Sequence, residues 1–338
     1  MATVYLDHAG SALRTVAGVL VVDSGVDGAR PARLPLGLIE RVVMRAEVTL
    51  TSSVLCALTE AGVSVVMLGG RRGERVAHTI GAWHNDAAVR VAQCIASVDT
   101  QRSASLTLHF VARKVARQRA TVDLIAAARA DLRKACFDAS ATLDRCETAL
   151  TDTPSGSSTL TVESLRGLEG AAAAAYFPAY FAAFPPSLGA RNRKRRPPPD
   201  PVNATLSLAY TLLASIAVRA CWTAGLDPAV GFLHGLAHGR ASMACDLMEP
   251  WRPAVDVWVW QQFQSRELRA ESFGSDGSGA CLLGKAGRAH FYRAFEPLGR
   301  RLERAMRRHA RLIRTHLLSQ SPAIDGVLTD FESDINQL

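Results

Sequence analysis

The sequence lacks both a disulfide framework and a zinc-ribbon pattern, because its seven cysteines are an odd number and none stands in a C-x-x-C pair. This cysteine usage is typical of a reducing cytosol, so we expect a cytoplasmic protein. The N-terminus, MATVYLDHAG, has no basic region followed by an apolar stretch and predicts no signal peptide. No internal repeat is present, which excludes solenoid architectures.

The sequence also lacks an apolar segment that is free of prolines and polar residues and long enough to span a membrane. Residues 170–190 contain three prolines, which would break a lipid-exposed helix. Residues 201–218 carry Asn, Thr and Ser side chains among the apolar ones, which favours a buried core helix. With 48% hydrophobic and 21% charged residues, the composition is that of a globular protein and excludes a disordered one. We therefore expect no membrane partner.

The pattern of the chain changes near residue 85, and 338 residues favour two domains. Before that point, short apolar runs alternate with turn signals and predict strands at Val4–Leu6, Val16–Val22, Val42–Met44 and Val63–Leu68. A short helix is expected from Ser52 to Ala61, closed by Gly62. Apolar and polar residues do not alternate in the runs at 16–22 and 63–68, so each of these strands is expected to be buried on both faces.

After residue 85 the apolar period becomes 3.6, which is typical of helices. Two apolar stripes are predicted to be buried: Ala87, Val91, Cys94, Ile95 and Val98, and then Val111, Val115, Val122, Ile125 and Leu132. Residues 151–161 are predicted to form a loop by their composition. The fold class expected is α+β and multidomain, with a small β-rich domain at 1–85, a larger all-α domain at 86–320 and a C-terminal tail at 321–338.

Positive charge is concentrated in the predicted helical part. The formal net charge is +8, with 8 Lys and Arg against 7 Asp and Glu in residues 1–80 and 31 against 24 in the remainder. Such a balance favours nucleic acid or an acidic surface as partner. A candidate DNA-binding loop, stiffened by Pro197–Pro199, holds Arg191, Arg193, Lys194, Arg195 and Arg196. An ordinary solvated loop is the alternative.

A second basic cluster lies at residues 299–314, with seven arginines against one Glu. A buried stripe is predicted on this helix, formed by Leu298, Leu302, Met306 and Ile313. The pattern is equally compatible with an ordinary surface helix.

The segment GFLHGLAHGRASMACDLMEP, residues 231–250, places charged and metal-capable side chains among apolar ones. His234, His238, Asp246 and Glu249 fall within it. Burying such groups costs several kcal/mol unless a partner or a metal compensates. These side chains therefore either satisfy one another or hold a ligand.

Four motifs occur in a fixed order along the chain. They are SLRGLEG (164–170), RRPPPDPVN (195–203), GFLH (231–234) and GRASMACDLME (239–249). In this order and at this spacing they resemble the motifs of the CRISPR-associated spacer-acquisition integrase, the universal adaptation nuclease of CRISPR systems. The resemblance covers roughly residues 1–318.

The resemblance implies that Glu169, His234 and Glu249 are catalytic and bind one divalent metal. Oxygen ligands with one imidazole suit Mg²⁺ or Mn²⁺. Fifteen residues separate His234 from Glu249, about 22 Å along a straight helix, so the chain must turn, and Gly235 and Gly239 offer places for that.

Two further residues, Asp246 and Arg240, are expected to support the site. Alternatives remain open for each member: His234 as a hydrogen-bonded core residue, Glu169 as a cap or as a partner of Arg166 or Arg240, and Asp246 paired with Arg240 or His238. In addition, Pro250 is expected to end or kink the helix at Glu249.

The activity implied is metal-dependent cutting of DNA and joining of captured fragments to a repeat array by 3′-hydroxyl transesterification. Double-stranded DNA, a second copy of the chain paired through the β-rich domain, and a small ferredoxin-like partner protein are the implied partners. Two alternatives stay open: a catalytically silent DNA-binding scaffold of the same assembly, and an unrelated metal-dependent phosphoesterase.

Overall fold

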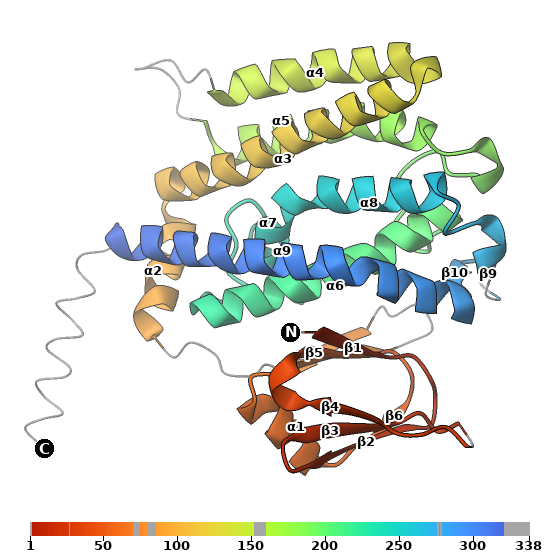
Figure 1. Cartoon of the computed structure of the whole chain (residues 1–338). Helices are drawn as coiled ribbons and strands as arrows, with labels where there is room; N and C mark the ends of the chain where they lie inside the picture. Colours follow the sequence, from red (N-terminus) through yellow and green to blue (C-terminus); the bar gives the residue numbers. More distant parts are fainter. Residues whose placement is uncertain are drawn as a thin grey trace, which may run out of the picture. The chain divides into compact units, whose positions relative to one another are not determined.

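The computed structural model describes residues 2–26, 28–69, 75–79, 86–151, 160–275, 277 and 279–320. A strand-rich N-terminal region is followed by a mostly helical one, which confirms the α+β class (Figure 1). The chain divides into two compact units, one of Met1–His84 with Gly284–Arg301 and one of Asn85–Leu283 with Leu302–Leu338. The predicted tail, residues 321–338, lies outside the described residues.

The strand-rich unit contains two four-stranded sheets. The first has the order β1 (Ala2–Leu6), β5 (Ile39–Met44), β7 (Ser64–Gly69) and β8 (Arg75–Thr79), with only the β7–β8 pair antiparallel. The second has the order β4 (Ala32–Pro35), β3 (Val19–Asp23), β2 (Ser11–Val16) and β6 (Val48–Thr49). Helix α1 (Ser52–Glu60) ends before Gly62, whose φ of 72° is the left-handed value that glycine adopts without strain. Leu20, Val42, Leu58 and Val65 form the centre of one apolar core.

The strand predicted at Val16–Val22 is wrong. Val16 ends β2, Val19 begins β3, and the two residues pair across a two-residue hairpin turn. Ala17 and Gly18 both have positive φ, 49° and 74°, as such a turn requires. The apolar run therefore belongs to two antiparallel strands. The glycines at positions 69, 70 and 73 indicate a turn after β7, and most of it falls on residues 70–74, which lie outside the described residues.

The part of α9 (Lys285–Ser319) up to Arg301 belongs to the strand-rich unit, although residues 86–320 were all predicted to be helical-domain residues. Tyr292 stacks on Tyr5 of β1 with ring centroids 4.5 Å apart. Glu296 accepts a hydrogen bond of 2.9 Å from the Thr3 amide. These contacts cover the face of the first sheet that points away from the apolar core. This face is therefore covered within one chain, and its burial alone does not require a second copy.

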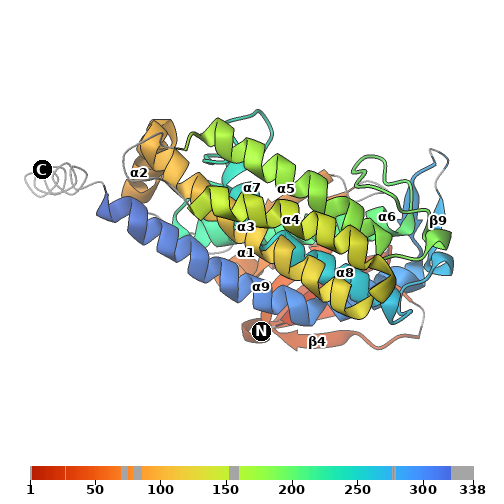
Figure 2. The ribbon, with the colours of Figure 1, turned by 90° about the horizontal axis from the view of Figure 1, so that it is seen from above.

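The helical unit is built from α2 to α8 and the end of α9. Their bounds are α2 Ala87–Val98, α3 Thr100–Ala128, α4 Arg133–Thr151, α5 Val162–Ala182, α6 Pro201–Ala224, α7 Ser242–Met248 and α8 Arg252–Gln264. Short polar side chains begin several of them, since Asp86, Asp99, Thr161 and Asp200 each accept a hydrogen bond from a first-turn amide. Helices α3, α4 and α5 lie side by side in both views (Figure 1, Figure 2). A short hairpin, β9 (Phe273–Ser275) with β10 (Cys281–Leu283), precedes α9.

The stripe predicted on α2 is not its buried face. Val91, Ile95 and Val98 are 47%, 44% and 80% exposed, while the opposite face, with Val89 and Gln93, is buried. The fully buried Gln93 amide donates to the carbonyls of residues 227 and 230 and accepts from the Asp227 amide. Because both faces of α2 are apolar, these hydrogen bonds select the buried one.

The other two stripes are confirmed, apart from half-buried Leu132. Val111, Val115, Val122 and Ile125 of α3 are buried, as are Leu298, Leu302, Met306 and Ile313 of α9. Helix α6 is long and apolar enough to cross a membrane, but 67% of its apolar window is buried against the rest of the chain. It has the burial of a core helix, as its scattered polar residues predicted.

Candidate active site

Two glutamates from distant parts of the sequence meet at one lysine. Glu169 lies on α5, Glu249 begins the 3₁₀ turn Glu249–Trp251 after α7, and Lys114 lies on α3. The Lys114 ammonium pairs with the Glu169 carboxylate and lies 2.6 Å from Oε2 of Glu249. Lys114 and Glu249 are only 7% and 4% exposed. The two carboxylates therefore converge on one buried ammonium.

His234 is held by Asp246 and keeps one ring nitrogen available. Its Nδ1 lies 2.6 Å from Oδ1 of Asp246. With the proton on Nδ1, Nε2 carries the lone pair that a metal would take. The same imidazole is one of the groups that lower the pKa of Glu249. Since such an influence weakens with distance, the imidazole lies near that carboxylate.

The Asp246 carboxylate has no free acceptor position with which to bind a metal. It is completely buried and accepts backbone hydrogen bonds from Phe232 at 2.6 Å, Leu233 at 3.0 Å and His234 at 2.9 Å. Together with the His234 ring, these donors use all four acceptor positions of the carboxylate. Asp246 therefore orients the histidine loop. Its partner is His234, so pairing with Arg240 or His238 is ruled out.

Two arginines fasten the same loop. Arg240 donates to the Gly235 carbonyl and, at 3.1 Å, to Ser242 Oγ, which places it in the supporting position predicted for it. Arg166 of α5 donates at 2.6 Å to the Leu233 carbonyl. Neither pairs with Glu169, whose partner is Lys114. His238 is exposed and takes no part in these contacts.

The backbone path follows from glycine and proline. A Cβ on Gly231 would stand 2.7 Å from the His234 carbonyl oxygen and from the Ser242 carbonyl carbon, so only glycine lets the loop approach α7 this closely. Gly239 has a φ of 69° and turns the chain between His234 and α7. Helix α7 stops at Met248, and the Glu249–Pro250 turn follows, as the proline predicted.

The charges keep Glu249 ionised. Burial raises the pKa of Glu249, but Arg252 and Lys114 outweigh it and bring that pKa to about 2. Nε of Arg252 lies 2.7 Å from Oε1 of the same carboxylate. Burial lowers the pKa of Lys114, but the carboxylates of Glu249 and Glu169 raise it by a larger amount. Its pKa therefore lies above the usual value, and the ammonium stays charged. The Glu249 carboxylate is thus available to a cation at neutral pH, and the Lys114 ammonium is that cation here.

The donor set fits a hard divalent cation. Within the described ranges, no three His, Cys, Asp or Glu side chains are already arranged around one metal position. The Lys114 ammonium takes the position between the two carboxylates that such an ion would use. Carboxylate oxygens with one imidazole nitrogen are ligands for Mn²⁺ and, less typically, for Mg²⁺. The residues therefore fit such an ion once Lys114 moves aside.

Lys114 and Arg252 were missed from the sequence. Lys114 interrupts the buried stripe of α3 between Val111 and Val115. A cation at a stripe position needs a buried anion, so that interruption was a signal. Arg252 stands three residues after Glu249, a spacing that allows an ion pair along a helical turn.

A buried tyrosine cluster lies behind the site. Asp256, 1% exposed, accepts hydrogen bonds from the hydroxyls of Tyr176, at 2.9 Å, and Tyr210. The Tyr180 hydroxyl donates at 2.9 Å to the Asp256 carbonyl. The Arg252 guanidinium lies 4.7 Å from the Tyr210 ring centroid and so connects this cluster to Glu249. Tyr176 therefore helps to hold the Asp256 carboxylate in this cluster.

This cluster predicts a pH dependence of stability. Burial raises the pKa of Asp256 to about 6, although the Tyr210 and Tyr176 hydrogen bonds oppose that shift. The folded state therefore holds this proton more tightly than the unfolded chain. The free energy of unfolding should then decrease as pH rises from about 4 to about 6.

In an Asp256→Asn variant, this decrease in the free energy of unfolding should be smaller by about 3 kcal/mol. Denaturant titrations from pH 4 to pH 7 measure it, with the exposed Asp138→Asn as control, and parallel curves would contradict it.

The basic loop presents four of its five cations to solvent. Arg191, Lys194, Arg195 and Arg196 are exposed. The prediction for Arg193 is wrong, because its guanidinium donates at 2.9 Å to Asn203 Oδ1 and at 3.2 Å to Ser207 Oγ. Asn203 is fully buried and also binds the Lys194 amide and the Asn192 carbonyl. Arg193 and Asn203 therefore anchor the loop to α6.

Comparisons with known proteins agree with the motifs. The profile of the family described as CRISPR associated protein Cas1 matches residues 4–297. The CRISPR-associated endonuclease Cas1 1 of Thermodesulfovibrio yellowstonii is 35% identical over 297 residues, which cover 88% of this chain and 91% of that protein.

Two solved structures share the fold. A Cas1 protein from Thermotoga maritima superposes with a TM-score of 0.78 at 20% identity, over 94% of this chain and 97% of its own. A casposase bound to its integration product gives 0.79 at 20% identity, over 95% and 92% of the two chains. The family profile spans nearly the whole chain, and a relative of more than 30% identity covers most of it. The chain therefore belongs to the Cas1 family of CRISPR-associated proteins.

Proposed function

We propose that this chain is a metal-dependent DNA endonuclease and integrase of CRISPR adaptation, which joins captured fragments to the repeat array by 3′-hydroxyl transesterification. The observation that carries the proposal is the convergence of Glu169 and Glu249 beside the Asp246-held imidazole of His234. The endonuclease name of the bacterial relative and the integration product held by the casposase support it.

In this proposal Glu169, His234 and Glu249 hold Mg²⁺ or Mn²⁺. Such an ion would neutralise the reacting phosphodiester and activate the attacking hydroxyl. Arg252 keeps Glu249 ionised, and Asp246 keeps the His234 lone pair aimed into the site. Lys114 neutralises the two carboxylates until an ion displaces it.

The rival functions make different demands on the site. A silent scaffold would not need Glu169, His234 and Glu249, so Mn²⁺-dependent nicking of branched DNA would exclude it. A small-molecule phosphoesterase would not need the exposed basic loop, so its turnover should be indifferent to duplex DNA as competitor. Strong competition by duplex DNA favours the nuclease.

The four exposed cations of the basic loop are expected to contact DNA phosphates. Changing Arg191, Lys194, Arg195 and Arg196 to Gln should flatten the slope of log affinity against log salt, by about 0.9 for each phosphate that is no longer neutralised. Fluorescence anisotropy with duplex DNA at several salt concentrations measures the slope. Because Arg193 binds Asn203, Arg193→Gln should lower stability and leave the slope nearly intact. An unchanged slope in the quadruple variant would mean that the loop is a solvated segment that does not contact DNA phosphates.

We also propose that the chain works as a homodimer with double-stranded DNA and a small ferredoxin-like partner, in the cytoplasm, as the family resemblance implies. Leu38 and Val16 are 62% and 46% exposed on the strand-rich unit. They lie near one hairpin, because the Leu36 amide donates at 2.9 Å to the Gly18 carbonyl. A pair of exposed apolar side chains is a candidate contact with a second copy.

Leu38→Asp tests this assembly. A carboxylate buried at an apolar contact would cost several kcal/mol, enough to shift a micromolar dimer to monomer. Light scattering at micromolar concentration should give twice the 36.2 kDa chain mass for the parent protein and the single-chain mass for the variant. A monomeric parent would contradict the dimer, and a dimeric variant would relocate the interface. Phe137→Asp, at a 73% exposed position on α4, is the matched control.

A further inference from the structure

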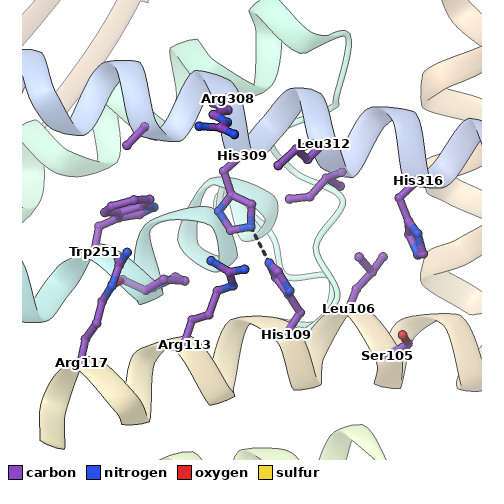
Figure 3. Close-up of a pocket in the computed structure, with 13 residues that line it drawn as sticks. Ser105, Leu106, His109, Arg113, Arg117, Trp251, Arg308, His309, Leu312 and His316 are labelled. Carbon is purple, nitrogen blue, oxygen red and sulfur yellow. Dashed lines mark hydrogen bonds between the residues drawn. The ribbon is translucent and has the colours of Figure 1, made fainter. Parts of the chain in front are cut away.

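The helical unit has a pocket of about 590 Å³ beside the candidate site. Its walls are α3, the C-terminal half of α9 and the Glu249–Trp251 turn. Figure 3 shows His109, Arg113 and Arg117 on one helix opposite Arg308 and His309 on the other. Arg117 donates at 2.6 Å to the Pro250 carbonyl, and its guanidinium lies 3.9 Å from the Trp251 ring centroid. The pocket wall is therefore continuous with the residue after Glu249.

The pocket is cationic. Its lining includes three arginines and no carboxylate among the described residues. Arg113 and Arg308 are exposed and have no acidic partner in that part of the chain. The Nε2 atoms of His109 and His309 lie 2.8 Å apart. Burial, His109 and the neighbouring arginines lower the pKa of His309 to about 3, so the positive charge at neutral pH comes from the guanidinium groups.

The pocket is also apolar. Leu106 and Ile313 are buried in its wall, Leu312 is 60% exposed, and Trp251 closes one end. A bare phosphate would use only the arginines. Apolar walls beside guanidinium groups fit a ligand that carries both apolar side chains and carboxylates.

The chain itself contains such a segment. Residues 321–338, SPAIDGVLTDFESDINQL, have four acidic side chains and no Lys or Arg. Their apolar residues fall at the spacing of one helix face: Ile324, Val327, Leu328, Phe331, Ile335 and Leu338. The segment follows α9 directly. An extended chain of this length spans up to about 60 Å, and the ten residues from His309 to Ser319 of α9 rise about 15 Å. The segment is therefore long enough to return to the pocket.

We propose that residues 321–338 dock in this pocket of their own chain, with apolar side chains against Leu312 and Trp251 and carboxylates on Arg113 and Arg308. The family profile ends at residue 297, so the docked segment is additional to the matched region. A docked acidic segment occupies guanidinium groups that would otherwise be open to DNA phosphates next to Glu249. The tail then restrains DNA binding, a consequence that rests on the proposed function, whereas the docking does not.

Photo-crosslinking from the full-length chain tests the docking. With p-benzoylphenylalanine at Phe331, crosslinked peptides should contain residues 105–117 or 305–316. A mixture of ¹⁵N-labelled and unlabelled protein should give crosslinks within single chains. The same probe at the exposed Phe137 gives the background. Crosslinks to the exposed Val91–Val98 face of α2, or between labelled and unlabelled chains, would overturn the proposal.

A charge exchange sharpens the test. Arg113→Glu with Arg308→Glu should lower the crosslink yield by about fivefold for each ion pair removed, and Asp330→Lys, Glu332→Lys and Asp334→Lys should restore it. Arg304→Glu with Arg311→Glu makes the same charge change at exposed positions of α9 outside the pocket. An equal decrease in this control, or no decrease in the pocket variant, would overturn the proposal.

Duplex DNA affinity tests the restraint separately. Asp325→Asn, Asp330→Asn, Glu332→Gln and Asp334→Asn together should raise affinity about threefold or more at low salt, because the arginines are released. Pocket crosslinks with unchanged affinity would overturn the restraint on DNA but leave the docking in place. Absence of the pocket crosslinks in the parent chain would overturn both.

Discussion

Replacing Glu249 with Gln is expected to reduce Mn²⁺-dependent DNA cleavage and strand joining on the order of 10³-fold, because a metal ligand contributes several kcal/mol to the stabilised transition state. Gln keeps the shape of the side chain but removes the negative charge that Lys114 and Arg252 face. DNA affinity should change little, since the exposed loop cations lie elsewhere in the sequence. Single-turnover cleavage and joining of branched DNA at saturating Mn²⁺ measures the effect.

The control must separate catalysis from folding. Removing one partner of a buried ion pair destabilises a protein by about 3–5 kcal/mol, so circular dichroism and thermal unfolding of Glu249→Gln are needed beside the rates. Glu163→Gln is the matched surface variant, on α5 with an 80% exposed side chain, and should keep both rate and stability. A folded Glu249→Gln protein that cleaves at nearly the parent rate would remove Glu249 from the metal set.

Asp246→Asn is expected to combine a stability loss of about 3 kcal/mol with a 10–100-fold loss of metal affinity. Its two oxygens each accept two hydrogen bonds, and an amide nitrogen in either position would face two donors. The histidine loop would then lose its anchor, and the His234 ring would lose the group that fixes its tautomer. Denaturant unfolding gives the first quantity, and isothermal titration with Mn²⁺ gives the second.

Asp256→Asn is the matched control for this variant. It is equally buried on the neighbouring helix and accepts hydroxyl hydrogen bonds, but it does not contact His234. Its metal affinity should equal that of the parent chain. If both variants lost metal affinity alike, Asp246 would act only through general stability, and the positioning role would be wrong.

Many features of the fold could be predicted from the order of residues over short stretches of the sequence. The change from strand runs to a 3.6 period, the stripe of α3, the stripe of α9 and the break at Glu249–Pro250 all depend on near neighbours in the chain. The family resemblance predicted one site from Glu169, His234 and Glu249. Lys114 pairs with both glutamates, whereas the metal set stays a prediction. Local pattern suffices there because periodicity and turn chemistry act over a few residues.

The two errors have different causes. Val16–Val22 has one apolar composition, but positive φ at Ala17 and Gly18 divides it into two strands. Helix α2 is apolar on both faces, and the Gln93 hydrogen bonds to residues 227–230 decide which is buried. The first choice is made by a turn inside the run, and the second by hydrogen-bond partners as far as 134 residues away in the sequence.

The sequence by itself determined the fold class and the family, and it predicted the candidate metal ligands, which stay a prediction. Only the tertiary structure decided that Lys114 pairs with both glutamates and that Asp246 is saturated by donors. It also decided that Arg193 anchors its loop to α6 and that the part of α9 up to Arg301 belongs to the strand-rich unit. The physical reason is that burial and pairing of polar groups depend on which distant segments approach one another. A buried charge is compatible with the fold only beside its partner, and that partner stands 55 or more residues away for Lys114.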